Sequence, residues 1–293
     1  MGIMEIGARQ HLRQAPLSPH GTATPTSTSG TWPRPSEGFK GLDPQLPPQW
    51  SIPGESIRSQ RESRSRCLDI HSPTTAGAII DHLRFAPVLI VLPPVYALIA
   101  APTHYGVAAL NRMKRRLPGK NYGTAVGDLE KFWDMVDPQS VPPRLNGPRD
   151  LESTHDVFFF CKVAGSNVQT PVVRSGTHQT LILDGVHRSL MCEIEAAFLR
   201  EAEPDLFAGH SFSAPLITSC NLSGDPLGSI TDPVRGREFV DRQKVALRVR
   251  GSSRTAEVGS YPILELDKSG LSVQREGGLI RSRDLYKRFR KHH

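Results

Sequence analysis

The sequence has few apolar residues, few aromatic residues and few cysteines for its length. Of its 293 residues, 38% are hydrophobic and 6% are aromatic, whereas typical domains are about 45–50% apolar. The shortage is concentrated in residues 1–72, which are rich in Pro, Ser, Thr and Arg and show no hydrophobic periodicity. Such a segment cannot bury enough apolar surface to offset the entropy lost on ordering. We therefore expect a disordered extension over 1–72, a folded domain over 73–284 and a basic tail over 285–293.

Cysteine spacing argues against two kinds of site. Cys67, Cys161, Cys192 and Cys220 are far apart, and no C-x-x-C pair occurs. This pattern disfavours a structural zinc site and a disulfide framework. It is typical of a reduced, cytoplasmic protein. The start of the chain is poor in acids and contains several Arg and Ser residues, which leaves a mitochondrial location open as the alternative.

The common nucleotide-binding loops are missing. The sequence contains neither G-x-x-x-x-G-K-[ST] nor G-x-G-x-x-G, which excludes a P-loop and a Rossmann-type cradle by motif. A membrane-spanning run is also not expected, because Pro93-Pro94 divides the uncharged run at 85–101 and would break a helix. We interpret this run as a strand over 88–92, a turn and a second apolar segment.

Positive charge is in excess. The 36 Lys and Arg residues outnumber the 29 Asp and Glu residues, which leaves a formal net charge of +7. This favours an anionic partner: a nucleotide, a nucleic acid or an acidic membrane surface. Lys114, Arg115, Arg116 and Lys120 cluster at the end of a helix expected over 103–116. Cations there suit the helix dipole, and they equally suit a phosphate clamp.

One stretch, residues 213–226, combines a short apolar run with a dense set of small polar side chains. Ser219, Asn221 and Ser223 are spaced by two, so they would share one face of an extended chain. Gly224 and Pro226 then favour a turn. We interpret the stretch as a buried strand that ends in a ligand-holding loop.

The remaining periodicity predicts a mixture of helices and strands. Residues 137–155 are polar and Pro-rich, so a loop is expected there. The other helices are expected over 76–84, 128–136, 189–203 and 233–244, and strands over 157–163, 170–174, 181–183 and 245–249, with a hairpin of 261–267 and 271–275.

Several short motifs resemble those of the YrdC-like family in type and order. Each motif alone is weak, but together they cover roughly residues 74–283. They are Lys114-Arg-Arg116 with Leu117-Pro-Gly-Lys120, Val173-Arg-Ser-Gly-Thr-His178, Thr218-Ser-Cys-Asn-Leu-Ser-Gly224, Ser260-Tyr-Pro-Ile-Leu-Glu-Leu-Asp267 and Val273-Gln-Arg-Glu-Gly277.

The resemblance implies a fold and an activity. The fold is a single α/β domain with a twisted mixed sheet and helices around an open basic cavity. The activity is that of threonylcarbamoyl-AMP synthases, which are nucleotidyltransferases. They convert ATP, L-threonine and bicarbonate to threonylcarbamoyl-AMP and pyrophosphate, with Mg²⁺, for the modification of tRNA adenosine 37.

The resemblance also assigns roles to residues. Two residues, Tyr96 and Ser260, would face the amino-acid substrate, and no protein metal site is implied. The residues expected to act in catalysis are Lys114, Arg116, Ser219 and Asn221, and those expected to bind ATP are Arg116, Lys120, Thr170, Arg174, Ser219 and Arg275.

The sequence departs from the family pattern mainly on the amino-acid side. The family's opening strand ends in P-T-D-T-V-Y-G-L, whereas this chain has Leu92-Pro-Pro-Val-Tyr-Ala-Leu98. Ala125 stands where a family His is expected. The alternative hypothesis is therefore a non-catalytic relative that binds a nucleotide or double-stranded RNA.

Overall fold

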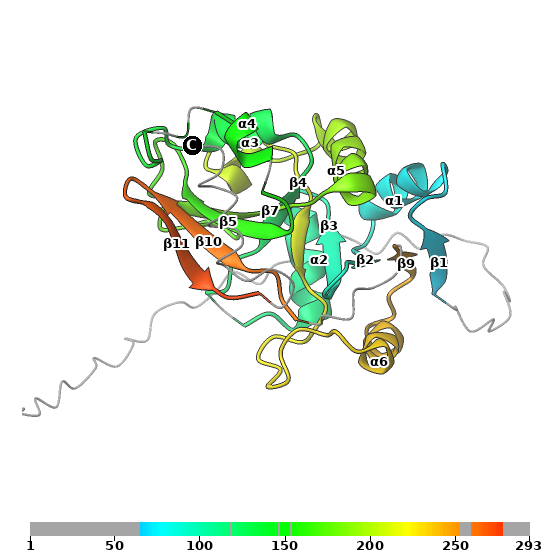
Figure 1. Cartoon of the computed structure of the whole chain (residues 1–293). Coiled ribbons are helices and arrows are strands. Elements are labelled where there is room, and N and C mark those ends of the chain that lie inside the picture. Colours follow the sequence, from blue (N-terminus) through cyan, green and yellow to red (C-terminus); the bar gives the residue numbers. More distant parts are fainter. Residues whose placement is uncertain are drawn as a thin grey trace, which may run out of the picture. The chain divides into compact units, whose positions relative to one another are not determined.

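One mixed sheet organises the described part of the chain (Figure 1). The structure, a computed structural model, describes residues 65–117, 119–143, 145, 147–152, 154–251 and 259–277. Its 11 strands have the order β1-β9-β2-β3-β8-β4-β7-β5-β10-β11, and β6 pairs with β7 off this path. The expected α/β class and mixed sheet are confirmed. Most of the extension over 1–72 and all of the tail over 285–293 lie outside the described residues.

The strands pair in both directions. Parallel pairs are β1 with β9, β2 with β9, β4 with β7 and β5 with β10. The other pairs are antiparallel. The strand bounds are β1 Arg66–Asp69, β2 Val88–Val91, β3 Tyr96–Ala100, β4 Gly123–Val126, β5 Val157–Lys162, β6 Val173–Arg174, β7 Thr177–Ile182, β8 Leu216–Ser219, β9 Leu247–Arg250, β10 Ile263–Asp267 and β11 Gly270–Arg275.

Helices cover both faces of the sheet. Ile79 of α1 packs in one core cluster with Ile90 of β2, and Leu110 of α2 packs in the other with Leu89. Because neighbouring residues of a strand point to opposite faces, these two clusters lie on opposite sides of the sheet. The helix bounds are α1 Thr75–Leu83, α2 His104–Lys114, α3 Leu129–Met135, α4 Arg149–Glu152, α5 Gly185–Phe198 and α6 Pro233–Gln243, with a 3₁₀ helix at Pro204–Phe207.

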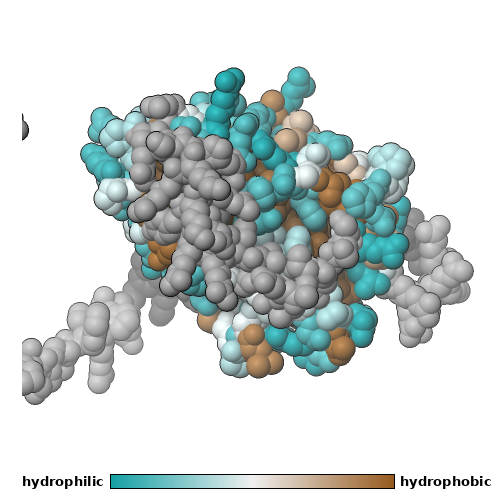
Figure 2. Space-filling view, viewed as in Figure 1, coloured by the Kyte–Doolittle hydropathy of each residue, from teal (hydrophilic) through white to brown (hydrophobic). Residues whose placement is uncertain are grey.

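The uncharged run at 85–101 forms the expected strand and turn, and its second apolar segment is a strand as well. β2 and β3 are antiparallel and join at Pro93-Pro94. Both strands are almost entirely buried, because the sheet is covered on both faces. No helix in the described ranges is long and apolar enough to cross a membrane. In the view of Figure 2, hydrophilic residues cover most of the described surface, with apolar residues visible between them.

Some elements differ from the expectation. β1 lies before residue 73, and it forms only through its long-range parallel pairing with β9. β4 was not expected, because a four-residue strand that contains Gly123 and Thr124 has too little periodicity to detect. α5 begins before residue 189, where the Asp184 side chain accepts a hydrogen bond from the Gly185 N–H. It ends at Phe198, ahead of Pro204, rather than at residue 203.

A buried carboxylate joins α5 to the turn after β4. Glu195 is 1% exposed, and its two oxygens accept hydrogen bonds from the N–H groups of Gly127 (2.7 Å) and Asp128 (3.0 Å). Gly127 is needed at this contact, since a Cβ atom there would lie 2.2 Å from the Cys192 nitrogen. Burial raises the pKa of Glu195 to about 7, although the two hydrogen bonds act in the opposite direction.

We expect Glu195 to make the stability of the fold depend on pH. A carboxyl whose pKa is raised on folding stabilises the folded state when protonated, so its contribution is lost as pH rises from about 4.5 towards about 7. The loss should be on the order of 1–3 kcal/mol. Urea unfolding of the wild type and of Glu195→Gln across this range measures it. The wild type should lose stability relative to the variant, and parallel pH profiles would contradict the prediction.

Candidate functional site

Lys114 ties the end of α2 to the loop that follows β8. Its side chain is 1% exposed. Its ammonium group donates hydrogen bonds to the carbonyl oxygen of Ser219 and to the carbonyl oxygen of Asn221, the latter at 2.7 Å. The Asn221 Oδ1 atom lies 3.5 Å from the same nitrogen and accepts a 2.6 Å hydrogen bond from the Ser219 hydroxyl. The structure therefore brings Lys114, Ser219 and Asn221 together.

The backbone adds further links between the same two segments. The Ser223 N–H donates to the Lys114 carbonyl (2.9 Å), and the Ser223 hydroxyl accepts from the Leu117 N–H (3.2 Å). α2 ends because Arg115 has φ 47°, in the left-handed region. The helix end and the loop after β8 thus hold each other in place.

Burial also shifts the pKa values of Lys114 and of the neighbouring Cys220. Burial, together with the nearby positive charges of Arg116 and Lys120, lowers the pKa of Lys114 to about 7. Burial raises the pKa of the Cys220 thiol to about 12, even though Lys114 acts in the opposite direction. Cys220 is therefore a protonated, buried thiol, and such a thiol is a poor nucleophile.

Arg116 shapes the loop that leads to β4. Its guanidinium carbon lies 4.3 Å from the centroid of the Tyr122 ring. Its N–H groups donate to the carbonyl oxygens of Lys120 (3.4 Å) and Asn121. Tyr122 is fixed in turn by a 2.8 Å hydrogen bond to Asn111 of α2. The 116–121 loop is thus closed on itself, with the Lys120 side chain exposed.

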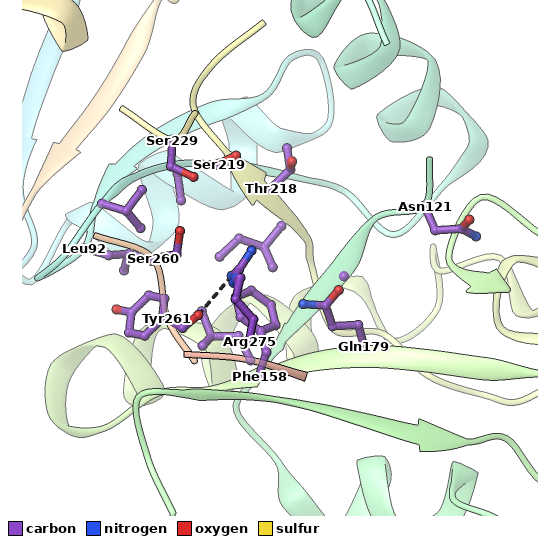
Figure 3. Close-up of a pocket in the computed structure, with 15 residues that line it drawn as sticks. Leu92, Asn121, Phe158, Gln179, Thr218, Ser219, Ser229, Ser260, Tyr261 and Arg275 are labelled. Atoms are coloured by element: carbon purple, nitrogen blue, oxygen red, sulfur yellow. Dashed lines mark hydrogen bonds between the residues drawn. The ribbon is translucent and has the colours of Figure 1, made fainter. Parts of the chain in front are cut away.

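A small cavity lies beside this loop (Figure 3). Its volume is about 150 Å³. Three predicted site residues line it: Ser219, Ser260 and Arg275. Other polar residues of the lining had no role assigned from the sequence. Thr218 and Tyr261 belong to the motifs at 218–224 and 260–267, whereas Asn121, Gln179 and Ser229 come from unconnected segments without a shared motif.

Arg275 is the cation of the cavity lining. It donates a 2.9 Å hydrogen bond to the Tyr261 carbonyl, and Figure 3 shows its side chain extending among Ser260, Thr218 and Gln179. This hydrogen bond holds the side chain in place. A guanidinium carries five N–H donors in all, so other donors can contact a ligand. The cavity therefore combines a held cation with hydroxyl and amide groups, a set suited to a small anionic ligand.

Other predicted residues lie outside this lining. The Thr170 hydroxyl donates to the Leu206 carbonyl (2.7 Å) and accepts from Val173 N–H (2.8 Å), so it stabilises the scaffold. Arg174 of β6 is exposed. His178 is fully buried between Thr124 Oγ1 (2.9 Å) and the Val172 carbonyl (3.0 Å), and burial lowers its pKa to about 4.

The structure does not place Tyr96 with Ser260. Ala97 pairs with Ser219 across β3 and β8, and both line the cavity. Tyr96, one residue earlier, therefore points to the other face of the sheet, where its ring lies against Gly236 of α6. Strand alternation thus separates Tyr96 from Ser260, and a role for Tyr96 at the amino-acid site stays a prediction.

A second cluster of polar residues was not visible in the sequence. His104 at the start of α2 lies 2.7 Å from Asp205 and 3.5 Å from Glu203. Ligand atoms of the three lie within 4.8 Å of one another. The hydrogen bond to Asp205 raises the pKa of His104. The cluster is largely exposed and acts as an ion-pair link between α2 and the 3₁₀ helix.

Comparison with known proteins identifies the fold. No family model matches the sequence, and no curated protein matches it. The structure is similar to P. abyssi Sua5 complexed with L-threonine, with a TM-score of 0.53, 14% identity and coverage of 76% of this chain and 61% of that chain. It is also similar to E. coli YciO, with a TM-score of 0.51, 15% identity and coverage of 73% and 96%.

A third similar structure is full-length HypF in its phosphate- and nucleotide-bound form. Its TM-score is 0.51 at 15% identity, with coverage of 69% of this chain and 29% of that chain. The chain thus spans less than two thirds of the length of Sua5 and of HypF. The similarities show that this chain has a YrdC-like fold, as the motifs predict.

We expect Lys114→Met to weaken the fold and to loosen the loop after β8. The methionine keeps the apolar stem but leaves two carbonyl oxygens without their donor, which should cost about 1–3 kcal/mol. Urea unfolding measures the loss. Arg112→Met is the matched control, since Arg112 is exposed on the same helix and should change stability by no more than about 0.5 kcal/mol. Equal stability of the two variants would contradict the structural role of Lys114.

Proposed function

We propose that the protein catalyses the threonylcarbamoyl-AMP synthase type of reaction, joining ATP, bicarbonate and L-threonine or another small amino acid. The observation that supports this most directly is the cavity in which Arg275, Ser219 and Ser260 meet, beside a loop fixed by buried Lys114. The likeness to Sua5, which was solved with L-threonine, supports a small amino acid as the ligand. By resemblance, the product would serve tRNA modification at adenosine 37.

The volume of the cavity indicates which substrate it can hold. A volume of about 150 Å³ suits a small amino acid, whereas sites for larger ligands usually measure about 300–1,000 Å³. In the proposal, the amino acid occupies the cavity and the triphosphate lies at its mouth, over the 116–121 loop. Asn121 belongs to both regions. Arg116, Lys120 and Arg174 remain the proposed phosphate ligands, as expected from the motifs.

The residues suit a reaction that needs charge neutralisation rather than a protein nucleophile. The threonine amine attacks the carbonyl carbon of bicarbonate and forms a carbamate with loss of water. A carbamate oxygen then attacks the α-phosphorus of ATP, the bond to the β-phosphate breaks, and pyrophosphate leaves. Arg275 and the cations of the 116–121 loop would stabilise the negative charge of this step. Because the described lining contains no carboxylate, Mg²⁺ would be held through phosphate oxygens.

A second candidate function is binding without catalysis. It is favoured by the position of Tyr96, which does not line the cavity. Of the two residues expected to contact the amino acid, only Ser260 lies there. In this case the protein would bind a nucleotide or double-stranded RNA, consistent with its net charge of +7.

Pyrophosphate release distinguishes the two functions. The full chain is incubated with ATP, Mg²⁺, bicarbonate and a panel of amino acids, and threonylcarbamoyl-AMP is identified by mass spectrometry. We expect release that requires all components and falls by about 100-fold or more in Arg275→Gln, because a charge-stabilising group is lost. Arg200→Gln, at an exposed site outside the cavity, should retain full activity.

A defined result would contradict the proposed enzyme activity. No release with any amino acid, together with RNA binding that weakens steeply with salt, would contradict the enzyme and support the binding protein. Unfolding measurements on Arg275→Gln show whether a loss of activity reflects the site or the fold.

A further inference from the structure

A second, larger hollow lies on the opposite face of the sheet from the cavity. Its volume is about 440 Å³. We call it the arginine groove, since three arginines line it: Arg237, Arg248 and Arg250. Strands β1, β2, β3 and β9 form its floor and α6 forms one wall, at the place where Figure 1 shows α6 beside the sheet.

The register of the strands explains why the charges gather here. Arg248 of β9 pairs with Leu89 of β2 and with Cys67 of β1, so these side chains share one face. Arg250 lies two residues further along β9 and points the same way. This is also the face of Tyr96, because Val91 pairs with Tyr96. Two arginines of one strand thus project beside Arg237 of α6.

The positive charge of the groove is only partly balanced. Arg250 Nε lies 3.5 Å from Asp69 Oδ2, between largely exposed side chains. Arg237 and Arg248 have no ion pair within the described ranges. The Nε atom of Arg248 is buried and lacks a hydrogen-bond partner there. Arg248 also lines the groove, and its guanidinium carries other N–H donors to which an anionic ligand can supply acceptors.

The rest of the groove is apolar and contains an aromatic ring. Leu89, Val91 and Val240 line it together with Tyr96. The Tyr96 ring packs closely on α6 because position 236 is glycine; a Cβ atom there would lie 3.0 Å from the ring. The groove therefore offers apolar and aromatic surface next to guanidinium groups, and its volume falls in the usual range of about 300–1,000 Å³ for small-molecule sites.

We propose that the arginine groove binds a nucleoside monophosphate, a ligand with a planar ring and a phosphate. The phosphate contacts Arg237 and Arg248, because guanidinium groups match phosphate oxygens in charge and geometry. The ring lies on the apolar surface near Tyr96. The concave shape favours a small ligand over duplex RNA. This site is separate from the proposed active cavity and does not depend on the proposed function.

Calorimetry on the full chain tests the groove with AMP and GMP, with inorganic phosphate, and with adenosine. Nucleotides should bind more tightly than phosphate or adenosine alone, since only they fill both parts of the groove. Arg237→Gln combined with Arg248→Gln should weaken AMP binding by about tenfold or more. Arg200→Gln, at an exposed site outside the groove, should leave it unchanged.

Two further measurements test the groove even if the double variant does not fold. Arg237→Gln alone changes an exposed side chain and should weaken AMP binding even if the double variant fails to fold. Photo-crosslinking with an azido derivative of AMP, followed by peptide mapping, should label residues 233–251. Labelling of residues 215–221 with loss of binding in Arg275→Gln, or no binding of any nucleotide, would overturn the proposal.

Discussion

The buried ammonium group of Lys114 joins the end of α2 to the end of β8 and the loop that follows it. These segments are far apart in the sequence. Lys114 would be costly to bury without partners, because desolvation penalises its charged form. Its environment supplies the carbonyl oxygens of Ser219, the last residue of β8, and of Asn221 in the loop that follows. The position of that loop is therefore coupled to the end of α2. Since Ser219 lines the cavity, this contact helps to fix one part of the cavity wall.

The alternation of strand residues distributes neighbouring side chains between the two faces of the sheet. On β3 and β8, Ala97 and Ser219 face the cavity, while Tyr96 lies on the face that holds the arginine groove. Neighbouring residues thus belong to separate sites. The 14–15% identity to solved structures of the same fold is compatible with such a redistribution, because the fold constrains the backbone more than the identity of surface side chains.

The cavity and the groove differ in how they hold positive charge. In the cavity, Arg275 is tied to the Tyr261 carbonyl, so a ligand would meet a fixed guanidinium. In the groove, Arg248 has a buried donor without a partner in the described ranges. The first arrangement is preorganised for one small anion, which is the arrangement that catalysis favours. The second leaves a buried polar atom unsatisfied within the described residues, which is rare in folded proteins.

Local patterns in the sequence were sufficient for the features that depend on neighbouring residues. Pro93-Pro94 separates β2 from β3, the β10–β11 hairpin follows from its alternation and turn, and the run at Thr218–Gly224 marks a polar strand end. Only the tertiary structure decided which side chains meet. Asn121, Gln179 and Ser229 join the cavity through strand order and loop packing, and β1 exists through its pairing with β9. Tyr96 lies away from Ser260 for the same reason: register and strand pairing are long-range interactions that residue spacing does not encode.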